Sequence, residues 1–154
     1  MITISPATTQ DAELMAPLLR KADMAEIQAS LGEDPKDCLM DSVRASHKCF
    51  VAKDEDGYIA MWGVVTMPGH PQMGIPWMTA TDALEKYSVK FLREAKDSLQ
   101  ELQEGYTVLT NFVDARNHVH IRWLQWMGFT FIGLRPKWGV EQRPFIQFMR
   151  LCRV

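Results

Sequence analysis

The chain has 154 residues, of which 47% are hydrophobic and 23% charged, and this composition suits one soluble domain with a continuous core. The formal net charge of −2, from 17 basic and 19 acidic residues, argues against a protein that binds nucleic acid through charge. No apolar run reaches the roughly 18 residues of a membrane span, and the N-terminus lacks a basic region followed by an apolar one. We therefore expect a cytoplasmic protein without a secretory signal.

The cysteines give no sign of a disulfide framework or of a metal site. Cys38, Cys49 and Cys152 are odd in number, widely spaced and without a C-x-x-C pair or a matching histidine pair. We expect isolated thiols and no bound metal.

The N-terminal third predicts a strand followed by two helices. Residues 2–5 alternate apolar and polar side chains like an edge strand, and Thr8 with Asp11 three residues later is a helix N-cap pattern. Helical apolar spacing then continues to about residue 30, with Gly32 as a stop. Pro35 is suited to the first turn of a second helix.

A hairpin is predicted next. Residues 49–53 and 58–67 are strand-like and flank Asp54–Gly57, which has the composition of a tight turn. A loop rich in Pro and Gly at 68–74 leads into a short apolar strand at 75–79.

The C-terminal half predicts alternating helices and strands. The expected elements are a long amphipathic helix from about Leu84 to just before Gly105, a strand at 106–113, a helix at 116–127 closed by Gly128, and strands at 129–134 and 144–151 that flank a polar loop containing Trp138. The order is β-α-α-β-β-β-α-β-α-β-β. It predicts an α/β fold with a mixed central sheet in a single domain, residues 1–154.

This order and one segment resemble the GNAT acetyltransferase family. Many members carry, after the fifth strand, an Asn followed eleven and twelve positions later by Gly-Phe, and Asn117, Gly128 and Phe129 fall on that frame with His120 and Leu124 between them. The resemblance implies that the fourth and fifth strands splay apart around the pantetheine of acetyl-CoA, and that Asn117 caps the next helix and faces this cofactor. A capped three-turn helix before a buried strand shows the same spacing in any fold.

Residues 75–134 resemble more closely the GNAT-like proteins encoded near the head and internal-core genes of short-tailed phages. The phrases that carry this resemblance are Val-Asp-Ala-Arg-Asn at 113–117, His-Ile-Arg-Trp-Leu-Gln-Trp-Met-Gly-Phe at 120–129, Thr-Asp-Ala-Leu at 81–84 and Phe-Leu-Arg-Glu at 91–94. Some of these proteins are labelled internal virion proteins. The resemblance implies a phage-encoded protein of the host cytoplasm or of the virion, with virion proteins among its candidate partners.

One departure from the family's enzymes concerns the phosphate loop. Active members bind the CoA pyrophosphate with a loop of the form Gln/Arg-x-x-Gly-x-Gly/Ala at a helix N-terminus, but no glycine occurs between Gly74 and Gly105. Asp82 and Glu85 would also place carboxylates there. The basic residues that follow either compensate as point charges or are simply solvated; they are Lys86, Lys90 and Arg93.

A second departure concerns the general acid. Leu124 stands where many members place the tyrosine that protonates the leaving thiolate. His120, one helical turn earlier, is the nearest titratable replacement, or else a structural histidine packed against the sheet. Asp114, at the end of the fifth strand, is the carboxylate best placed to act as a base, or else it caps the following helix. His120 and Asp114 are therefore the candidate catalytic residues.

The candidate cofactor residues lie along the fourth strand and near the two helices that follow it. They are Trp77, Met78, Thr79, Thr81, Lys86, Asn117 and Trp123. A strand N–H near Trp77 or Met78 is expected to stabilise the oxyanion. Tryptophans in such strands and helices fit a core as well as a groove.

Two functions stay open. The first is an acyl-CoA-dependent N-acyltransferase that transfers an acyl group to an unidentified amine, on a small molecule or a protein. The second is a non-catalytic GNAT scaffold, as a virion internal or assembly component or as a host-directed binding protein. The residues at 117–129 favour the first, and the missing glycine loop and tyrosine favour the second. The apolar last strand further suggests pairing of two chains across a two-fold axis.

Overall fold

A computed structural model describes residues 1–152, apart from the side chains of Ser88, Lys90 and Leu92. Its centre is one sheet with the strand order β1-β2-β3-β4-β5-β7-β6, in which β4 and β5 are parallel and the other neighbours antiparallel. The strands are β1 (Thr3–Pro6), β2 (Ser46–Asp54), β3 (Gly57–Met67), β4 (His70–Ala80), β5 (Val108–Asp114), β6 (Thr130–Trp138) and β7 (Arg143–Leu151). The predicted α/β fold with a mixed sheet is confirmed.

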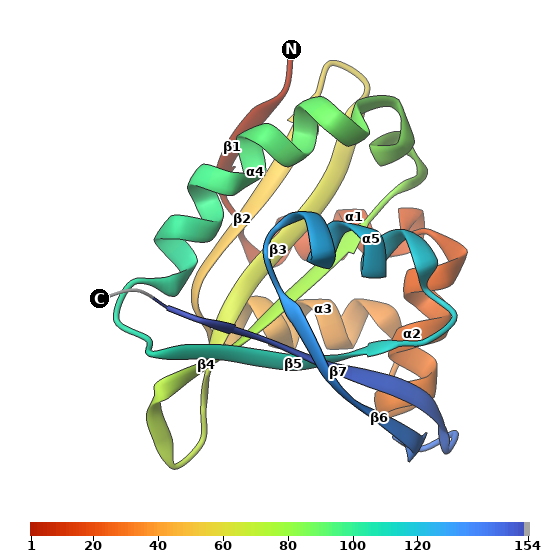
Figure 1. Cartoon of the computed structure of the whole chain (residues 1–154). Coiled ribbons are helices and arrows are strands. Elements are labelled where there is room, and N and C mark those ends of the chain that lie inside the picture. Colours follow the sequence, from red (N-terminus) through yellow and green to blue (C-terminus); the bar gives the residue numbers. More distant parts are fainter. Residues whose placement is uncertain (153–154) are drawn as a thin grey trace.

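Helices cover both faces of the sheet (Figure 1). They are α1 (Thr9–Met15), α2 (Lys21–Leu31), α3 (Pro35–Ala45), α4 (Ser88–Gln103) and α5 (His118–Trp126), with the short 3₁₀ helices η1 (Ala16–Leu18) and η2 (Asp82–Tyr87). Apolar residues of α1, α2 and α3 form one core layer with Val51 and Met61, and those of α4 and α5 form a second layer around Phe91 and Trp62. Each face of the sheet therefore has its own helical layer.

Local signals in the sequence set several of these boundaries as predicted. The backbone N–H of Asp11 donates to the Thr8 hydroxyl, and the N–H of Thr8 donates to the Asp11 carboxylate, which completes the N-cap of α1. Gly57, at φ 134°, closes the β2–β3 turn, and Gly128, at φ 92°, ends α5. These backbone angles favour glycine, because it carries no Cβ.

The prediction of one helix from residue 9 to about 30 was wrong. Pro17 lies in η1, where its missing N–H and its ring end the α-helical ladder of α1. Leu19 and Arg20 then have extended ψ angles of 148° and 146°. This extension lets Leu19 bridge to Thr81, and it lets the N–H of Arg20 donate to the carbonyl of Ala80 at 2.9 Å. The break in the helix thus ties the start of α2 to the end of β4.

Three further predictions need correction. The segment 68–74 is not a loop, because Gly69, at φ 79°, turns the chain and β4 begins at once with His70. Trp138 is not in a loop but at the end of β6, where it stacks on Phe112. The last strand, for which pairing with a second chain was suggested, already pairs with β5 and β6 on its two sides; β6 and β1 are the edges of the sheet.

The parallel pair β4–β5 opens almost at once. Only Met73 with Val108 and Gly74 with Leu109 are paired, and beyond them the two strands diverge, as Figure 1 shows. A Cβ on Gly74 would lie 2.7 Å from side-chain atoms of both Leu109 and Val64, so the closest approach of these strands requires glycine. The result is a gap in the middle of the sheet.

Candidate active site

The gap between β4 and β5, called the window below, exposes backbone groups of both strands. The pairing of β3 with β4 is regular from Ala60 with Ala80 to Thr66 with Gly74, so the N–H and C=O groups of β4 alternate strictly in direction. The carbonyls of Pro76 and Ala80 both have partners on the side of β5. Residues 76, 78 and 80 therefore direct their backbone groups into the window, over about 13 Å at ~3.3 Å per residue.

Asn111 closes the narrow end of the window. Its Nδ2 donates to the carbonyl of Pro76 at 2.7 Å, and its Oδ1 accepts the N–H of Phe112 at 2.8 Å. One carboxamide thus replaces the ladder hydrogen bonds that β4 and β5 no longer form with each other. Pro76 loses nothing here, because a proline has no N–H to satisfy.

Asp23 of α2 closes the wide end. This residue is only 3% exposed, and its carboxylate accepts the N–H of Ala80 at 2.9 Å and the Nδ2 of Asn117 at 2.9 Å. Arg20, also buried, lies 3.6 Å from the same carboxylate. Burial raises the pKa of Asp23, and its charged neighbours oppose that rise only in part. Asp23 therefore links α2 to the end of β4 and to the N-cap of α5.

Met78 lies midway between these two closures. Alternation directs its N–H and C=O into the window, and among the described residues no side chain bonds to either group. Its side chain points to the face that α4 and α5 cover, where it packs against the core. The amide of Met78 is thus a hydrogen-bond donor in the open part of the window.

His120 and Glu26 face each other beside the window. Glu26 Oε1 accepts the N–H of Asp114 at 2.8 Å, and Glu26 Oε2 lies 3.7 Å from Nδ1 of His120. Burial lowers the pKa of His120, but the Glu26 and Asp23 carboxylates outweigh it, so this pKa lies above its ordinary value. Because Nδ1 faces Glu26, Nε2 is the ring nitrogen left to face open space.

Two cavities meet at the window. The inner cavity, of about 450 Å³ including its open mouth, lies under α4 and α5 and is almost wholly apolar; its walls include Trp62, Leu99 and Leu124. The front groove, of about 1100 Å³ including its open mouth, lies between the sheet and the helices α2 and α3. His120 and Met78 line both spaces. A group entering from either side of the sheet thus meets the same histidine.

Buried polar atoms without a partner gather around these two cavities. Trp62 Nε1 is such an atom in a wall of the inner cavity, and Thr79 Oγ1 is one in a wall of the front groove. A buried polar atom without a hydrogen bond costs free energy, about 1–3 kcal/mol each. Such atoms are suited to a polar ligand that enters both cavities.

The structure brings together several of the predicted site residues. Trp77, Met78 and Thr79 line the window or its cavities, and His120 faces both. Asn117 caps α5, with the N–H of His120 at 3.4 Å from its Oδ1. Its amide donates to Asp23, so it meets that carboxylate at the wide end of the window.

Four other predicted residues lie elsewhere. Thr81 is buried and donates its hydroxyl to the carbonyl of Tyr58 at 2.8 Å. Lys86 is exposed, 3.9 Å from Asp56 in the β2–β3 turn. Trp123 packs in the core, 6.2 Å from Phe91 between ring centres. Asp114 lies outside the lining of both cavities. Of the basic residues near Lys86, the side chain of Lys90 lies outside those described.

Asp114 is held in an ion pair instead. Its carboxylate accepts the Nη2 of Arg116 at 2.7 Å and the backbone N–H of the same residue at 2.9 Å. Burial raises the pKa of Asp114, but the hydrogen bonds from Arg116 outweigh this effect, and the pKa lies below its ordinary value. A carboxylate with a lowered pKa and occupied oxygens is a poor base.

Sequence reasoning missed the residues that α2 contributes. Arg20, Asp23 and Glu26 recur at three-residue spacing, which puts all three on one face of a helix. The pattern was visible, but a charged face usually points to solvent, and nothing in the sequence indicated that this one turns toward the sheet.

The resemblance implies an acyl-CoA cofactor. The window offers apolar walls and hydrogen-bond donors for its acyl-pantetheine end, whereas the sequence between Gly74 and Gly105 has no glycine to cradle its diphosphate end. The inner cavity is apolar, and the amide of Met78 and Nε1 of Trp62 are donors for amide and thioester oxygens. The segment between β4 and α4 is η2, with Asp82 and Glu85 in its first turn. Recognition is therefore expected to rest on the acyl and pantetheine groups.

The sheet order, the one splayed parallel pair and the helices on both faces define a GNAT fold. No protein-family model matches the chain, and no curated protein sequence does. Solved structures of three acetyltransferases match nearly its whole length. They are a GNAT-family acetyltransferase from Streptococcus pneumoniae (13% identity, 99% of this chain and 100% of that chain, TM-score 0.66), an aminoglycoside acetyltransferase in complex with coenzyme A (14%, 98% and 95%, 0.69) and the ribosomal-protein-S18-alanine N-acetyltransferase from Escherichia coli (13%, 100% and 96%, 0.69).

At these identities the likeness shows the fold. None of the three names refers to a phage, so the resemblance to phage proteins stays a prediction, as does the expected location in the cytoplasm or virion. Among the described residues, no helix is long and apolar enough to cross a membrane, and no group of three or more His, Cys, Asp and Glu side chains could hold a metal ion.

Proposed function

We propose that the chain is an acyl-CoA-dependent N-acyltransferase whose reaction takes place in the window between β4 and β5. One observation carries the proposal: His120, paired with Glu26, lines both cavities beside the free amide of Met78. A donor that enters the inner cavity and an amine that enters the front groove would meet at this histidine. The GNAT fold supports the same assignment.

The chemistry follows from the positions of these groups. Acyl-CoA supplies a thioester whose carbonyl carbon the amine attacks, so that a C–N bond forms and the C–S bond breaks. The N–H of Met78 donates to the carbonyl oxygen as negative charge develops on it. His120 Nε2 accepts the proton that the amine loses and returns it to the thiolate. Glu26 stabilises the imidazolium between these two transfers.

This assignment explains how the chain manages without the tyrosine of many GNAT enzymes. Leu124 lines the inner cavity and contributes an apolar wall there. His120 lies one turn earlier on α5 and faces both sides of the window, so a single residue takes the roles of base and acid. Asp114, an expected base, has a structural role in this scheme.

Turnover by matched histidine variants tests the proposal. The assay is thiol release from acetyl-CoA in the presence of a primary amine. His120→Gln is compared with His118→Gln, which alters an exposed histidine on the same helix. Loss of acid–base catalysis lowers the rate by about 10²–10⁴-fold, so the first variant should lose at least 100-fold and the second almost nothing. Equal activity of the two variants would contradict the proposed role.

A second candidate is a GNAT-fold protein that binds its ligand without turnover. The observation in its favour is that Asp23 and Asn111 already occupy the backbone groups at the two ends of the window. This candidate predicts binding of coenzyme A by calorimetry with no thiol release for any amine. Thiol release that depends on His120 would exclude it.

A further inference from the structure

The front groove carries little charge. Among the described residues that line it, Glu26 is the sole carboxylate, His120 is the sole basic side chain, and there is neither Lys nor Arg. Burial raises the pKa of the Cys38 thiol in its wall to about 11, so this thiol adds no charge. The described residues of the groove can therefore bind one cationic group of a ligand, through Glu26, and they offer no lysine or arginine to bind an anionic group.

The polar side chains of the groove are mostly occupied already. Ser42 donates its hydroxyl to the carbonyl of Cys38 at 2.8 Å, and Ser30 to that of Ile27 at 3.4 Å. Thr79 Oγ1, by contrast, is buried and without a partner among the described residues. The groove thus offers one carboxylate and one free hydroxyl.

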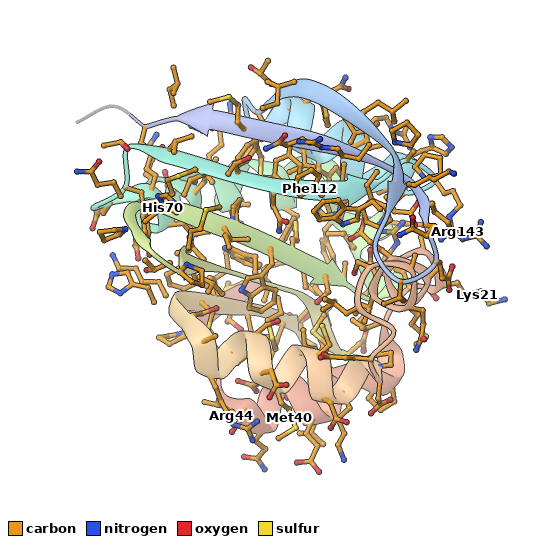
Figure 2. The ribbon with its side chains drawn as sticks, turned by 90° about the horizontal axis from the view of Figure 1, so that it is seen from below. Lys21, Met40, Arg44, His70, Phe112 and Arg143 are labelled. Carbon is orange, nitrogen blue, oxygen red and sulfur yellow. The ribbon has the colours of Figure 1, made fainter. Side chains whose placement is uncertain are left out.

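Aromatic rings form much of the remaining wall. Phe112 and Trp138 stack at 3.9 Å between ring centres with 20° between their planes, and Phe145 beside them is only 1% exposed. Trp77 is fixed by the bond from its Nε1 to Ser46 Oγ at 2.8 Å. Figure 2 shows Lys21 and Arg44 of the neighbouring helices pointing outward at the rim of the molecule, away from Phe112. Flat, immobile rings suit an apolar or aromatic body.

The β6–β7 turn holds this aromatic wall against α2. The N–H of Val140 donates to the carbonyl of Ser30 at 3.2 Å, and the N–H of Glu141 to that of Ala29 at 3.1 Å. Gly139, at φ 70°, permits the approach, since a Cβ there would lie 2.4 Å from the Ala29 oxygen. The groove is therefore bounded on a third side, which favours a small ligand.

From these observations, and resting on the proposed function, we infer that the acceptor is a small primary monoamine with an apolar or aromatic body. The ammonium group binds Glu26, next to His120, and the body lies against Phe112 and Trp138. The hydroxyl of Thr79 can donate a hydrogen bond to one acceptor atom of the ligand. Polyamines and acidic amines are excluded, because the described residues that line the groove include no second carboxylate, no lysine and no arginine.

An amine panel tests this inference with acetyl-CoA as the donor. The probes are phenethylamine, n-propylamine, spermidine and L-glutamate, compared by kcat/KM. Burial of the ring should favour phenethylamine over n-propylamine by roughly 10–100-fold. Trp138→Leu should reduce the ratio of kcat/KM for phenethylamine to that for n-propylamine. A general loss of activity would lower both values and leave this ratio unchanged. A preference for spermidine or L-glutamate would overturn the inference.

Calorimetry separates the inference from the proposed function. Phenethylamine is titrated into the protein with coenzyme A present, and Glu26→Gln is compared with Glu13→Gln, an exposed control on α1. Loss of the charged partner should weaken binding by about tenfold or more in the first variant alone. If no amine is acylated but phenethylamine still binds through Glu26, the proposed function fails and the groove assignment stands. If phenethylamine does not bind, the groove assignment fails.

Discussion

Replacing Met78 with proline removes one hydrogen atom that the proposed chemistry needs. In most central strands a proline also removes a ladder hydrogen bond, but the N–H of Met78 faces the window, where β4 has no neighbouring strand. Pro76, two residues earlier and with the same direction, already shows that β4 accepts a proline at such a position. Met78→Pro therefore tests the oxyanion donor with little harm to the sheet.

The expected loss follows from the value of a single oxyanion donor. Removing one such N–H costs about 2.7–4 kcal/mol in the transition state, which is a fall in kcat of about 10²–10³. Truncating the partly buried Met78 side chain costs stability as well, by about 1–3 kcal/mol. Met78→Ala also removes the thioether side chain but keeps the N–H, so the comparison of the two variants tests the donor.

The assay is thiol release from acetyl-CoA at saturating amine, with melting temperatures recorded for both variants. Met78→Pro should turn over at least 100 times more slowly than Met78→Ala while melting within a few degrees of it. If the folded proline variant matches the alanine variant in kcat, the Met78 amide is not the donor, and the window has been assigned the wrong role.

Three further variants test other parts of the site. Glu26→Gln removes one cause of the raised pKa of His120. In the wild type, kcat/KM should rise with pH around a value above 6.5, and in this variant the rise should occur at lower pH. An unchanged pH profile would show that Glu26 does not act on His120. The same variant should lose stability mainly below pH 6.5, because the ion pair is lost anyway as the pH rises through the folded-state pKa. Asp114→Asn breaks the bonds to Arg116 and should lower the free energy of unfolding by about 1–3 kcal/mol while kcat/KM stays near that of the wild type; the reverse result would make Asp114 catalytic. Gly139→Ala should lower the free energy of unfolding by at least ~1 kcal/mol and raise the KM for the amine. An unchanged melting temperature would show that the β6–β7 turn can accommodate a Cβ at this position.

Most elements could be predicted from the sequence because their signals are local. The Thr8–Asp11 cap, the turn at Gly57 and the stop at Gly128 depend on residues a few positions apart. Asn117 likewise marked the start of α5. Such signals fix where helices and turns begin and end, whatever the rest of the chain does.

The errors arose where a distant partner decided the structure. Pro17 was visible in the sequence, but the extended stretch that follows it is held by the bridge from Leu19 to Thr81, more than sixty residues away. Trp138 belongs to a strand and not to a loop because it pairs with Arg143 of β7, and its ring stacks on Phe112 of β5. Neither partner could be identified from spacing along the chain.

The candidate site was predicted in part for the same reason. Met78 and His120 could be placed through the resemblance to the GNAT frame, which sets their distance from recognisable elements. Glu26 and Asp23 reach the window only because α2 packs across it, and that packing has no sequence motif of its own. The sequence thus located the window and one catalytic candidate but not the carboxylates that surround it.

The most direct test of the account is a crystal structure of the protein with acetyl-CoA. The pantetheine arm should lie in the inner cavity, with the thioester oxygen within hydrogen-bond distance of the Met78 N–H and the acyl group facing His120. The proposed site would be contradicted if acetyl-CoA bound outside the window. In that case the hydrogen bonds from Asn111 to Pro76 and from Ala80 to Asp23 would remain at the two ends of an empty window.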